Sequence, residues 1–274
     1  MTGRWERWLR VPEPWEVAAW LRQASDWLRV RLRQPRTQLL LALLALAALL
    51  RLTYLDLIPF GPAQLAPLRQ ALEIRMLGSL PAAGPPQAGQ PAAVGVAGPP
   101  LLSYALAIPV LFSRDPRLAV ALVVLAHLAA LALLFVAARQ QWGLRVAGLA
   151  AALYSVNPWA VLWARDLSPE SLLLPLATVL LVTLVWAIAD RRPWAWPLAL
   201  AALGLALNAS LYGLPLALMV AALALAYRRR VAWPHFLLGV AILALVCLPY
   251  LNHDNAQRFR GLRSAAAQLW RGSS

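Results

Sequence analysis

The chain has 274 residues, of which 61% are hydrophobic and 13% charged, with a formal net charge of +14 and a single cysteine, Cys247. Soluble domains are about 45–50% apolar and about 25% charged, so this composition excludes a water-soluble globule, a disordered chain and a disulfide scaffold. Basic nucleic-acid-binding domains are polar, so no nucleic-acid partner is expected, and the composition predicts an all-α membrane protein.

Residues 1–36 form a cytoplasmic region that is rich in tryptophan and arginine at helical spacing. Trp20, Ala24 and Trp27 share one face of a helix, whereas Arg22 and Arg29 lie on or near the other side. Such a helix lies in the membrane interface, with its indole rings at headgroup depth and its arginines against anionic headgroups. The region is therefore predicted to be an amphipathic anchor on the lipid bilayer. A docking helix for a partner protein is the alternative.

About seven segments after this region are apolar and approach the ~20 residues that a membrane span requires. They are residues 37–55, 117–138, 146–162, 170–189, 193–209, 211–227 and 231–250. The first is the weakest of them, because Arg51 interrupts its apolar run. A long side chain near a helix end is expected to snorkel to the interface, so Arg51 is compatible with a span.

Arginines accumulate in every second connection between the predicted spans, and cytoplasmic loops are the ones that retain arginine. With a cytoplasmic N-terminus, fifteen arginines face the cytoplasm. Eight of them precede residue 37, and the others are Arg139, Arg145, Arg191, Arg192, Arg228, Arg229 and Arg230. The pattern therefore predicts the topology of a multi-pass membrane domain over residues 37–250, followed by a basic tail over residues 251–274.

The first outer loop, residues 56–116, is too long for a plain connector. It is expected to hold two juxtamembrane helices, Pro62 to Leu77 and Leu101 to Phe112, on either side of a tract rich in proline, glycine and alanine. Counting the second helix as a span would invert every later loop, and the alternation of arginines argues against that inversion. The helix is therefore placed along the outer surface.

His127 lies inside a predicted span, where a polar side chain is costly. A hydrogen bond to a neighbouring helix is its expected role, and a proton relay is the alternative. The three histidines and the one cysteine are scattered along the chain and have no metal-ligand spacing. No metal or cofactor is therefore predicted.

Several short motifs follow one another in a fixed order along residues 37–250. They are Arg51-Leu52, then PPLLSY at residues 99–104, AGLAAALYSVNP at residues 147–158, and Pro169-Glu170. In this order they resemble the GT-C superfamily of integral-membrane glycosyltransferases, particularly its protein O-mannosyltransferase and lipid A aminoarabinose transferase branch. The resemblance implies a multi-pass protein of the bacterial inner (plasma) membrane.

That superfamily binds a polyprenyl-phosphate-linked sugar from the outer leaflet and transfers the sugar to an acceptor outside. An acidic pair in the first outer loop acts as the general base, and basic residues hold the donor phosphate. These groups meet a chemical need, because the acceptor must lose a proton while a negatively charged phosphate departs. This chain lacks the acidic pair, since residues 58–65 read IPFGPAQL.

Three other carboxylates could replace the missing pair: Glu170, Asp166 and Asp56. Pro169-Glu170 matches a Pro-Asp step of the superfamily, and Asp166 precedes Glu170 by four residues. The two acids share a face if a helix already begins at Asp166. Alternatively, Ser168 or Asp166 caps the following helix, with Glu170 favourably placed in its first turn.

Arg51, Arg69 and Arg165 are predicted at the outer face, where bidentate arginine suits a lipid phosphate.

One functional hypothesis is therefore a glycosyltransferase, shortened or degenerate, in which other carboxylates replace the usual base. The other is a pseudoenzyme: a non-catalytic scaffold that keeps the GT-C fold and binds partner membrane subunits. A transporter is disfavoured because the spans lack intramembrane charges. The chain ends soon after its seventh predicted span, as a shortened relative or a fragment would.

Overall fold

A computed structural model describes residues 34–53, 61–78, 80–85, 98–259 and 263. The predicted amphipathic helix before residue 34 lies outside these residues, as do Asp56 and the last eleven residues of the basic tail. The chain divides into two compact units, Met1–Ala42 and Leu43–Ser274. The second unit holds almost all of the described residues.

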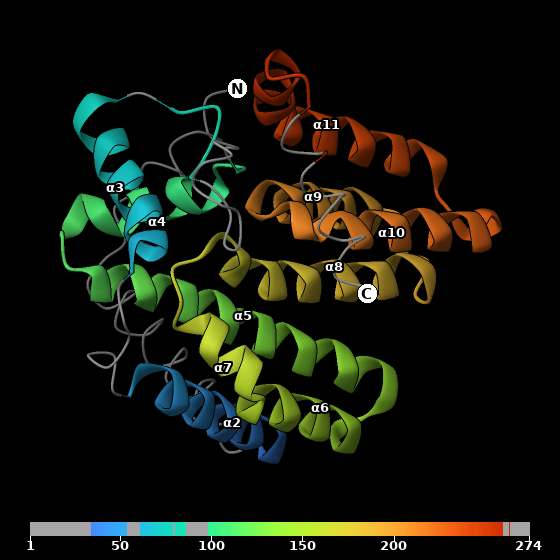
Figure 1. Cartoon of the computed structure of the whole chain (residues 1–274). Coiled ribbons are helices and arrows are strands. Elements are labelled where there is room, and N and C mark those ends of the chain that lie inside the picture. Colours follow the sequence, from blue (N-terminus) through green and yellow to red (C-terminus); the bar gives the residue numbers. More distant parts are fainter. Residues whose placement is uncertain (1–33, 54–60, 79, 86–97, 260–262, 264–274) are drawn as a thin grey trace, which may run out of the picture. The chain divides into compact units, whose positions relative to one another are not determined.

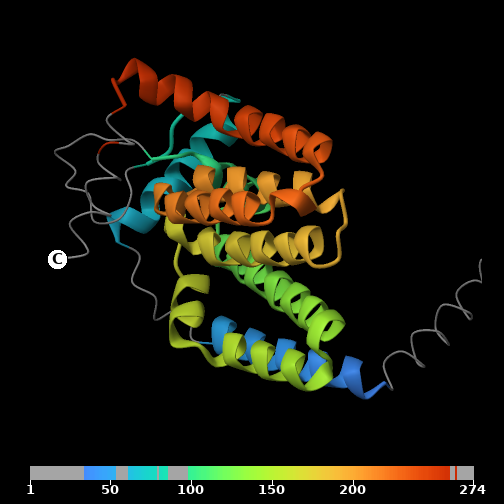
Figure 2. The same ribbon diagram turned by 90° about the vertical axis from the view of Figure 1, so that its right-hand side faces the viewer.

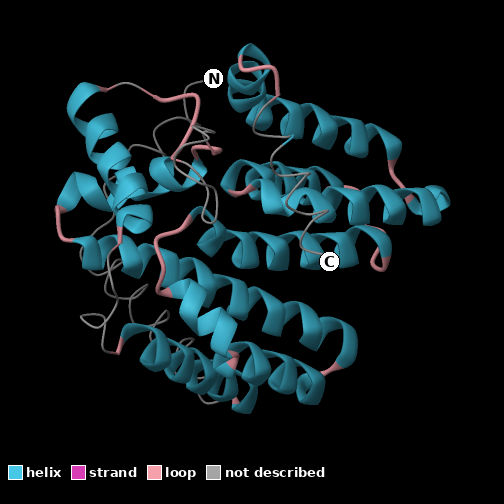
Figure 3. Ribbon diagram, in the orientation of Figure 1, coloured by secondary structure: helices cyan, strands magenta, loops and turns pink. Residues whose placement is uncertain are grey.

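All regular structure in the described residues is helical (Figure 3), which confirms the predicted fold class. The α-helices are α2 (Pro35–Leu52), α3 (Pro62–Leu77), α4 (Leu101–Phe112), α5 (Pro116–Trp142), α6 (Leu144–Val156), α7 (Pro158–Ala164), α8 (Leu173–Ile188), α9 (Ala195–Ala209), α10 (Leu214–Ala226) and α11 (Trp233–Ala256). Short 3₁₀ helices join them: η4 (Pro169–Leu172), η5 (Leu211–Gly213) and η6 (Arg228–Arg230). Both predicted juxtamembrane helices, α3 and α4, are present.

Within the described residues, four helical segments are long and apolar enough to cross a membrane: α2, α5, Pro169–Ile188 and α11. The predicted span 146–162 is broken, because α6 and α7 meet at an angle of 59°. Counting this bent pair as one span gives five. Helices α9 and α10 lie where two further spans are predicted, but they are shorter than 18 residues.

The turn between α5 and α6 depends on a single glycine. Gly143 has φ of 85°, a backbone conformation that side-chain-bearing residues rarely adopt, and α6 begins at the next residue. At the other end of α5, the Asp115 side chain accepts a hydrogen bond of 2.9 Å from the backbone N–H of Arg117. Pro116 follows this N-cap at the first helical position, where its missing N–H costs nothing.

The helices of the second unit stack in a definite order. Helix α8 lies between α5 and α9, and α9 in turn packs against α11 (Figures 1 and 2). Trp196 of α9 is fully buried in this stack, and its ring meets that of Phe236 from α11 edge-on, with centroids 5.4 Å apart. Such edge-to-face pairs add specific packing energy to the burial of apolar surface.

Helices α9 and α11 approach closely because Gly239 has no side chain. A Cβ atom at this position would lie 2.7 Å from Cδ1 of Leu200 and 3.1 Å from Cα of Pro197. The second of these atoms belongs to the backbone of α9 and cannot move aside without shifting the helix.

We therefore expect Gly239→Ala to lower the free energy of unfolding by about 1–3 kcal/mol, which is the usual cost of overpacking a core. Denaturant titration in mixed micelles measures this change. Leu245 is 71% exposed on the same helix, so Leu245→Ala serves as the control and should change stability by about 0.5 kcal/mol or less. Equal stability of the two variants would contradict the close approach of α9 and α11.

Helices α3 and α4 pack against each other, and polar contacts from the PPLLSY motif hold the start of α4 in place. The Ser103 hydroxyl donates to Oε1 of Gln70 at 2.6 Å, and Nε2 of Gln70 donates to the carbonyl of Ala83 at 2.8 Å. The Tyr104 hydroxyl donates to the carbonyl of Pro81. Burial raises the pKa of the Tyr104 phenol, so the group stays protonated and remains a donor. These bonds fix the loop that follows α3 against the start of α4.

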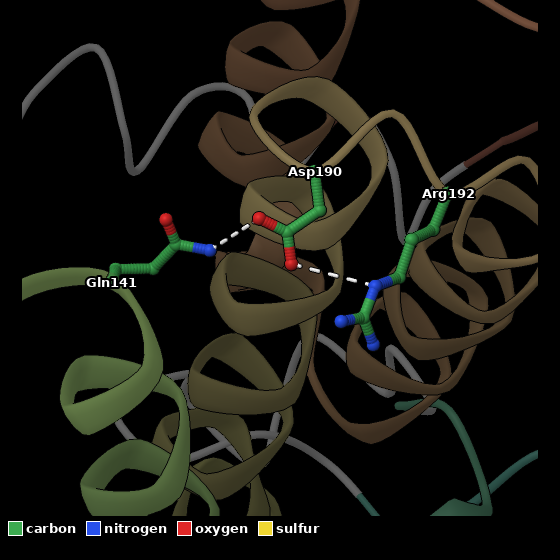
Figure 4. Close-up of polar contacts among 3 residues, drawn as sticks. All are labelled: Gln141, Asp190 and Arg192. Carbon is green, nitrogen blue, oxygen red and sulfur yellow. Dashed lines mark hydrogen bonds and ion pairs between the residues drawn. The ribbon is translucent and has the colours of Figure 1, made fainter.

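The basic connections α5–α6, α8–α9 and α10–α11 lie at one end of the stacked helices, on the right in Figure 1. At that end, Nε2 of Gln141 donates to Asp190 at 2.6 Å, and Nε of Arg192 lies 3.4 Å from the other oxygen of the same carboxylate (Figure 4). The aspartate thus joins the end of α5 to the α8–α9 turn. The structure groups the connections that the arginine pattern predicts to be cytoplasmic.

Candidate functional site

The turn η4 lies at the opposite end of the helices and contacts α4, α5, α7, α8 and α9. Helix α7 ends at Ala164, and a short loop leads into the turn. Pro169, Glu170 and Ser171 are all buried. A four-residue 3₁₀ turn has poor hydrogen-bond geometry of its own, so the surrounding helices determine its position.

Glu170 is only 7% exposed, and neither oxygen of its carboxylate has a hydrogen-bond partner among the described residues. The hydroxyl of the adjacent Ser171 is also buried and unpaired within that part of the chain. Burying an ionised carboxylate without a partner costs several kcal/mol in principle, so such groups are rare outside functional sites. The carboxylate of Glu170 is therefore available to a proton or a ligand.

Three polar side chains act electrostatically on the Glu170 carboxylate: those of Ser168, Asp166 and Tyr212 from η5. The structure thus brings together Glu170 and Asp166, two of the three predicted carboxylates. It adds Tyr212, which the sequence analysis missed because a lone tyrosine in an apolar segment gives no distinguishing pattern.

The predicted helical face shared by Asp166 and Glu170 is absent, because Asp166 lies in the loop between α7 and η4. Ser168, the residue before Pro169, is extended, as the proline ring requires of its predecessor. Ser168 occupies the N-cap position of η4, but its side chain makes no capping hydrogen bond. Glu170 does lie in the first turn, as the capping alternative predicts.

The three predicted phosphate-binding arginines lie in different environments. Arg69 of α3 is exposed and forms an i,i+4 ion pair with Glu73, with Nε and Oε1 3.4 Å apart. Arg165 follows α7 and is half-buried, and its Nη2 donates to the carbonyl of Thr53 at 3.0 Å. Only Arg165 shares the loop that carries Asp166 and leads to Glu170.

Arg51 departs most from its prediction, because its side chain is fully buried and does not snorkel to an interface. Its Nη1 donates to the carbonyl of Ser155 at 3.0 Å and to that of Ala47 at 3.2 Å. Its Nη2 donates to the carbonyl of Tyr154 at 3.2 Å. The guanidinium therefore caps the C-terminal end of α6, where a positive charge also interacts favourably with the helix dipole.

The Asn157-Pro158 step explains why α6 needs this cap. Proline has no N–H, so Pro158 cannot donate to the carbonyl of Tyr154 four residues earlier. The N–H groups of Trp159 and Ala160 donate instead to the side chain of Asn157, at 2.9 and 3.2 Å. The last carbonyls of α6 are thereby left without their helical partners, and Arg51 supplies donors to two of them. The same step produces the bend between α6 and α7.

His127 is fully buried in α5 and makes the predicted hydrogen bond to a neighbouring helix. Its Nδ1 lies 3.2 Å from the hydroxyl of Tyr154 on α6, and its Nε2 lies 2.9 Å from the carbonyl oxygen of Ser171 in η4. Cζ of Arg51 lies 5.8 Å from the centroid of the Tyr154 ring. A line of polar groups thus runs from Arg51 to the turn that bears Glu170.

A cavity of about 160 Å³ lies beside η5, on the side of the α9–α11 pair. Its lining is apolar except for Asn208, Cys247 and Tyr250. The Asn208 amide donates to the carbonyl of Val246 at 2.7 Å, whereas its Oδ1 has no hydrogen-bond partner within the described ranges. Leu211 of η5 lines the cavity and precedes Tyr212, whereas Glu170 is not among the lining residues.

Residues 97–253, which make up more than half of the chain, match the family described as dolichyl-phosphate-mannose-protein mannosyltransferase. The chain belongs to this family. The matched segment includes Arg165, Asp166 and Glu170, as well as His127. It does not include Arg51, Arg69 or Asp56. Membership confirms the predicted resemblance to GT-C membrane glycosyltransferases, and the protein is a multi-pass membrane protein of that superfamily.

Among solved structures, the chain is similar to ArnT from Cupriavidus metallidurans, crystallised with undecaprenyl phosphate, with a TM-score of 0.56 and 19% sequence identity. The match covers 86% of this chain and 43% of the ArnT chain, so this chain spans less than half the length of that protein. The likeness shows a shared GT-C fold. No curated protein matches the chain.

Proposed function

We propose that the protein transfers a sugar from a polyprenyl-phosphate donor to an acceptor at the outer face of the membrane, with Glu170 as the general base. The observation that carries this proposal is the buried, unpaired carboxylate of Glu170, within the segment that matches the family. The ArnT structure supports the choice of donor, because that protein of the same fold holds undecaprenyl phosphate. On this proposal η4 lies at the outer ends of the helices and the basic connections lie in the cytoplasm.

The proposed reaction needs one proton acceptor and one group that stabilises a leaving phosphate. Glu170 accepts the proton of the acceptor as the acceptor attacks the anomeric carbon of the sugar. The bond between that carbon and the phosphate oxygen breaks, and the polyprenyl phosphate leaves with the electron pair. Asp166 and Tyr212 both interact electrostatically with Glu170, the carboxylate that we assign to the proton transfer.

Arg165 is the arginine that we assign to the donor phosphate. It lies in the loop that leads to Glu170 and is half-buried, whereas the side chain of Arg69 is 84% exposed. Arg51 donates its hydrogen bonds to backbone carbonyls of α2 and α6. A guanidinium close to the carboxylate would stabilise the charge that develops on the leaving phosphate.

We expect Arg165→Gln to raise the KM for a polyprenyl-phosphate sugar donor about tenfold or more, since hydrogen bonds to charged groups contribute about 1.5–3 kcal/mol. The measurement is transfer of a radiolabelled sugar by the full chain in proteoliposomes, at several donor concentrations. Arg114→Gln is the matched control, because Arg114 is an exposed arginine of the predicted outer loop. Equal donor KM values for the two variants would remove Arg165 from the phosphate site.

A further inference from the structure

His127 uses both of its ring nitrogens in hydrogen bonds deep in the helical stack. The carbonyl oxygen of Ser171 can only accept, so Nε2 of His127 carries the proton and donates across 2.9 Å. In the neutral ring Nδ1 is then an acceptor, and the hydroxyl of Tyr154 donates to it across 3.2 Å. Both ring nitrogens of His127 are thus held by hydrogen bonds, and the side chain has no exposed surface.

The bond to Ser171 falls on the residue that closes the turn around Glu170. The N–H of Ser171 donates to the carbonyl of Ser168 at 3.0 Å, which forms the 3₁₀ turn itself. Because His127 binds the carbonyl of the same residue, it fixes the peptide that follows Ser171, one residue after Glu170. Pro169 has no N–H, so the turn has few hydrogen bonds of its own to keep the carboxylate in one orientation.

Tyr154, which contacts the other ring nitrogen of His127, is itself held in place. Tyr154 lies beside the buried guanidinium of Arg51, which donates to the backbone carbonyl of the same tyrosine at 3.2 Å. The tyrosine hydroxyl thus reaches His127 from a helix end that is itself capped. A histidine inside an apolar span is costly, and a leucine would fill the volume without that cost. What histidine adds at this position, and leucine would lack, is the hydrogen bond to the η4 turn.

We propose that His127 is a positioning residue for Glu170: by donating from Nε2 to the carbonyl of Ser171, it holds the η4 turn so that the carboxylate faces the acceptor. The catalytic part of this inference rests on the proposed function. His127 itself does not touch the reacting atoms; it acts through the backbone of the turn. The geometry assigns Tyr154 a supporting role, because its hydroxyl selects the tautomer of His127 that can donate to Ser171.

Two substitutions of His127 separate the bond to Ser171 from the rest of the side chain. Glutamine places an amide N–H near the position of Nε2 and preserves the donation, whereas asparagine is too short to reach Ser171. Leu131→Ala is the matched control, because Leu131 is fully buried about one turn further along α5. It weakens the packing of the same helix without removing a hydrogen bond to η4.

Two measurements are made on each variant of the full chain in lipid nanodiscs. The first is hydrogen exchange of the backbone amide of Ser171, which reports opening of the turn. The second is kcat and KM for sugar transfer. We expect His127→Asn to accelerate the exchange and to lower kcat, each about tenfold, which is the effect of losing one buried hydrogen bond. The donor KM should stay within about twofold of wild type, and His127→Gln should restore both quantities.

The proposal is overturned if His127→Asn exchanges and turns over like wild type, if His127→Gln is as impaired as His127→Asn, or if Leu131→Ala produces the same pattern. Should His127→Asn fail to fold, Tyr154→Phe replaces it and is expected to show a smaller change of the same kind. A wild type that transfers no sugar would overturn the proposed function instead. The exchange rates would then still decide whether His127 holds the turn.

Discussion

Replacing Glu170 with glutamine should lower kcat for sugar transfer by about 10²–10⁴-fold, which is the usual contribution of a general base. Glutamine has the shape of glutamate but cannot accept the proton of the acceptor. The donor KM should change little, because Glu170 interacts with the acceptor and not with the phosphate. Initial rates of label transfer by the full chain in proteoliposomes measure both constants.

The stability of the same variant provides an internal control. Glu170 is buried without a hydrogen-bond partner in the described part of the chain, so a neutral amide is cheaper to bury than the carboxylate. The thermal midpoint of Glu170→Gln should therefore equal or exceed that of wild type. Glu73→Gln is the matched variant, because the Glu73 side chain is 54% exposed, and it should retain wild-type kcat. A Glu170→Gln enzyme with wild-type kcat would exclude Glu170 as the base.

The second large effect is expected at Arg51, where Arg51→Leu should lower the free energy of unfolding by about 3 kcal/mol. The substitution removes the donors to the carbonyls of Tyr154 and Ser155, which have no helical partners because of the Asn157-Pro158 step. Each buried carbonyl left unpaired costs about 1–3 kcal/mol. Denaturant unfolding in mixed micelles measures the change.

Arg51→Lys distinguishes the shape of the guanidinium from its charge. Lysine keeps the positive charge at the end of α6, but it cannot donate to the Tyr154 and Ser155 carbonyls with the same planar fork. We expect it to recover about half of the lost stability. Arg114→Leu, at an exposed position, should leave the unfolding free energy near that of wild type. If Arg51→Leu were as stable as Arg114→Leu, the capping role of Arg51 would be wrong.

The two juxtamembrane helices could be predicted because their ends have strong local determinants. Pro62 begins α3 and Gly78 follows its end with φ of 64°, as a glycine at a helix C-terminus commonly does. Pro100 precedes α4, and Arg114-Asp115-Pro116 separates it from α5. Proline and glycine act on the backbone within a few residues, so a sequence alone fixes these boundaries.

The bend between α6 and α7 was not predicted, although its cause is equally local. The apolar run 146–162 has the composition of a span. Hydropathy measures only apolar content, so it does not show that Asn157-Pro158 removes helical hydrogen bonds. The absence of a helix at Asp166 has a similar cause, because Pro169 keeps Ser168 extended. In the first place proline outweighed the hydropathy on which the prediction relied, and in the second it outweighed the helical spacing.

The candidate site could be predicted only in part. Glu170 and Asp166 could be named because Pro169-Glu170 matches a Pro-Asp step of the superfamily and Asp166 precedes Glu170 by four residues. The burial of Arg51 and its contacts with α6 depend on residues more than 100 positions away, and no local pattern encodes such a contact. The same holds for the bond between His127 and Ser171, which joins positions 44 residues apart.

Sugar transfer with Glu170 as the base can be tested by a stoichiometric assay of donor turnover by the purified full chain in proteoliposomes. A labelled polyprenyl-phosphate sugar is supplied, and transferred sugar and released polyprenyl phosphate are both quantified. Wild type should form the two products in equal amounts, and Glu170→Gln should form neither above background. An intact donor after incubation with wild type, whatever sugar it carries, would contradict the account and favour a non-catalytic scaffold with a GT-C fold.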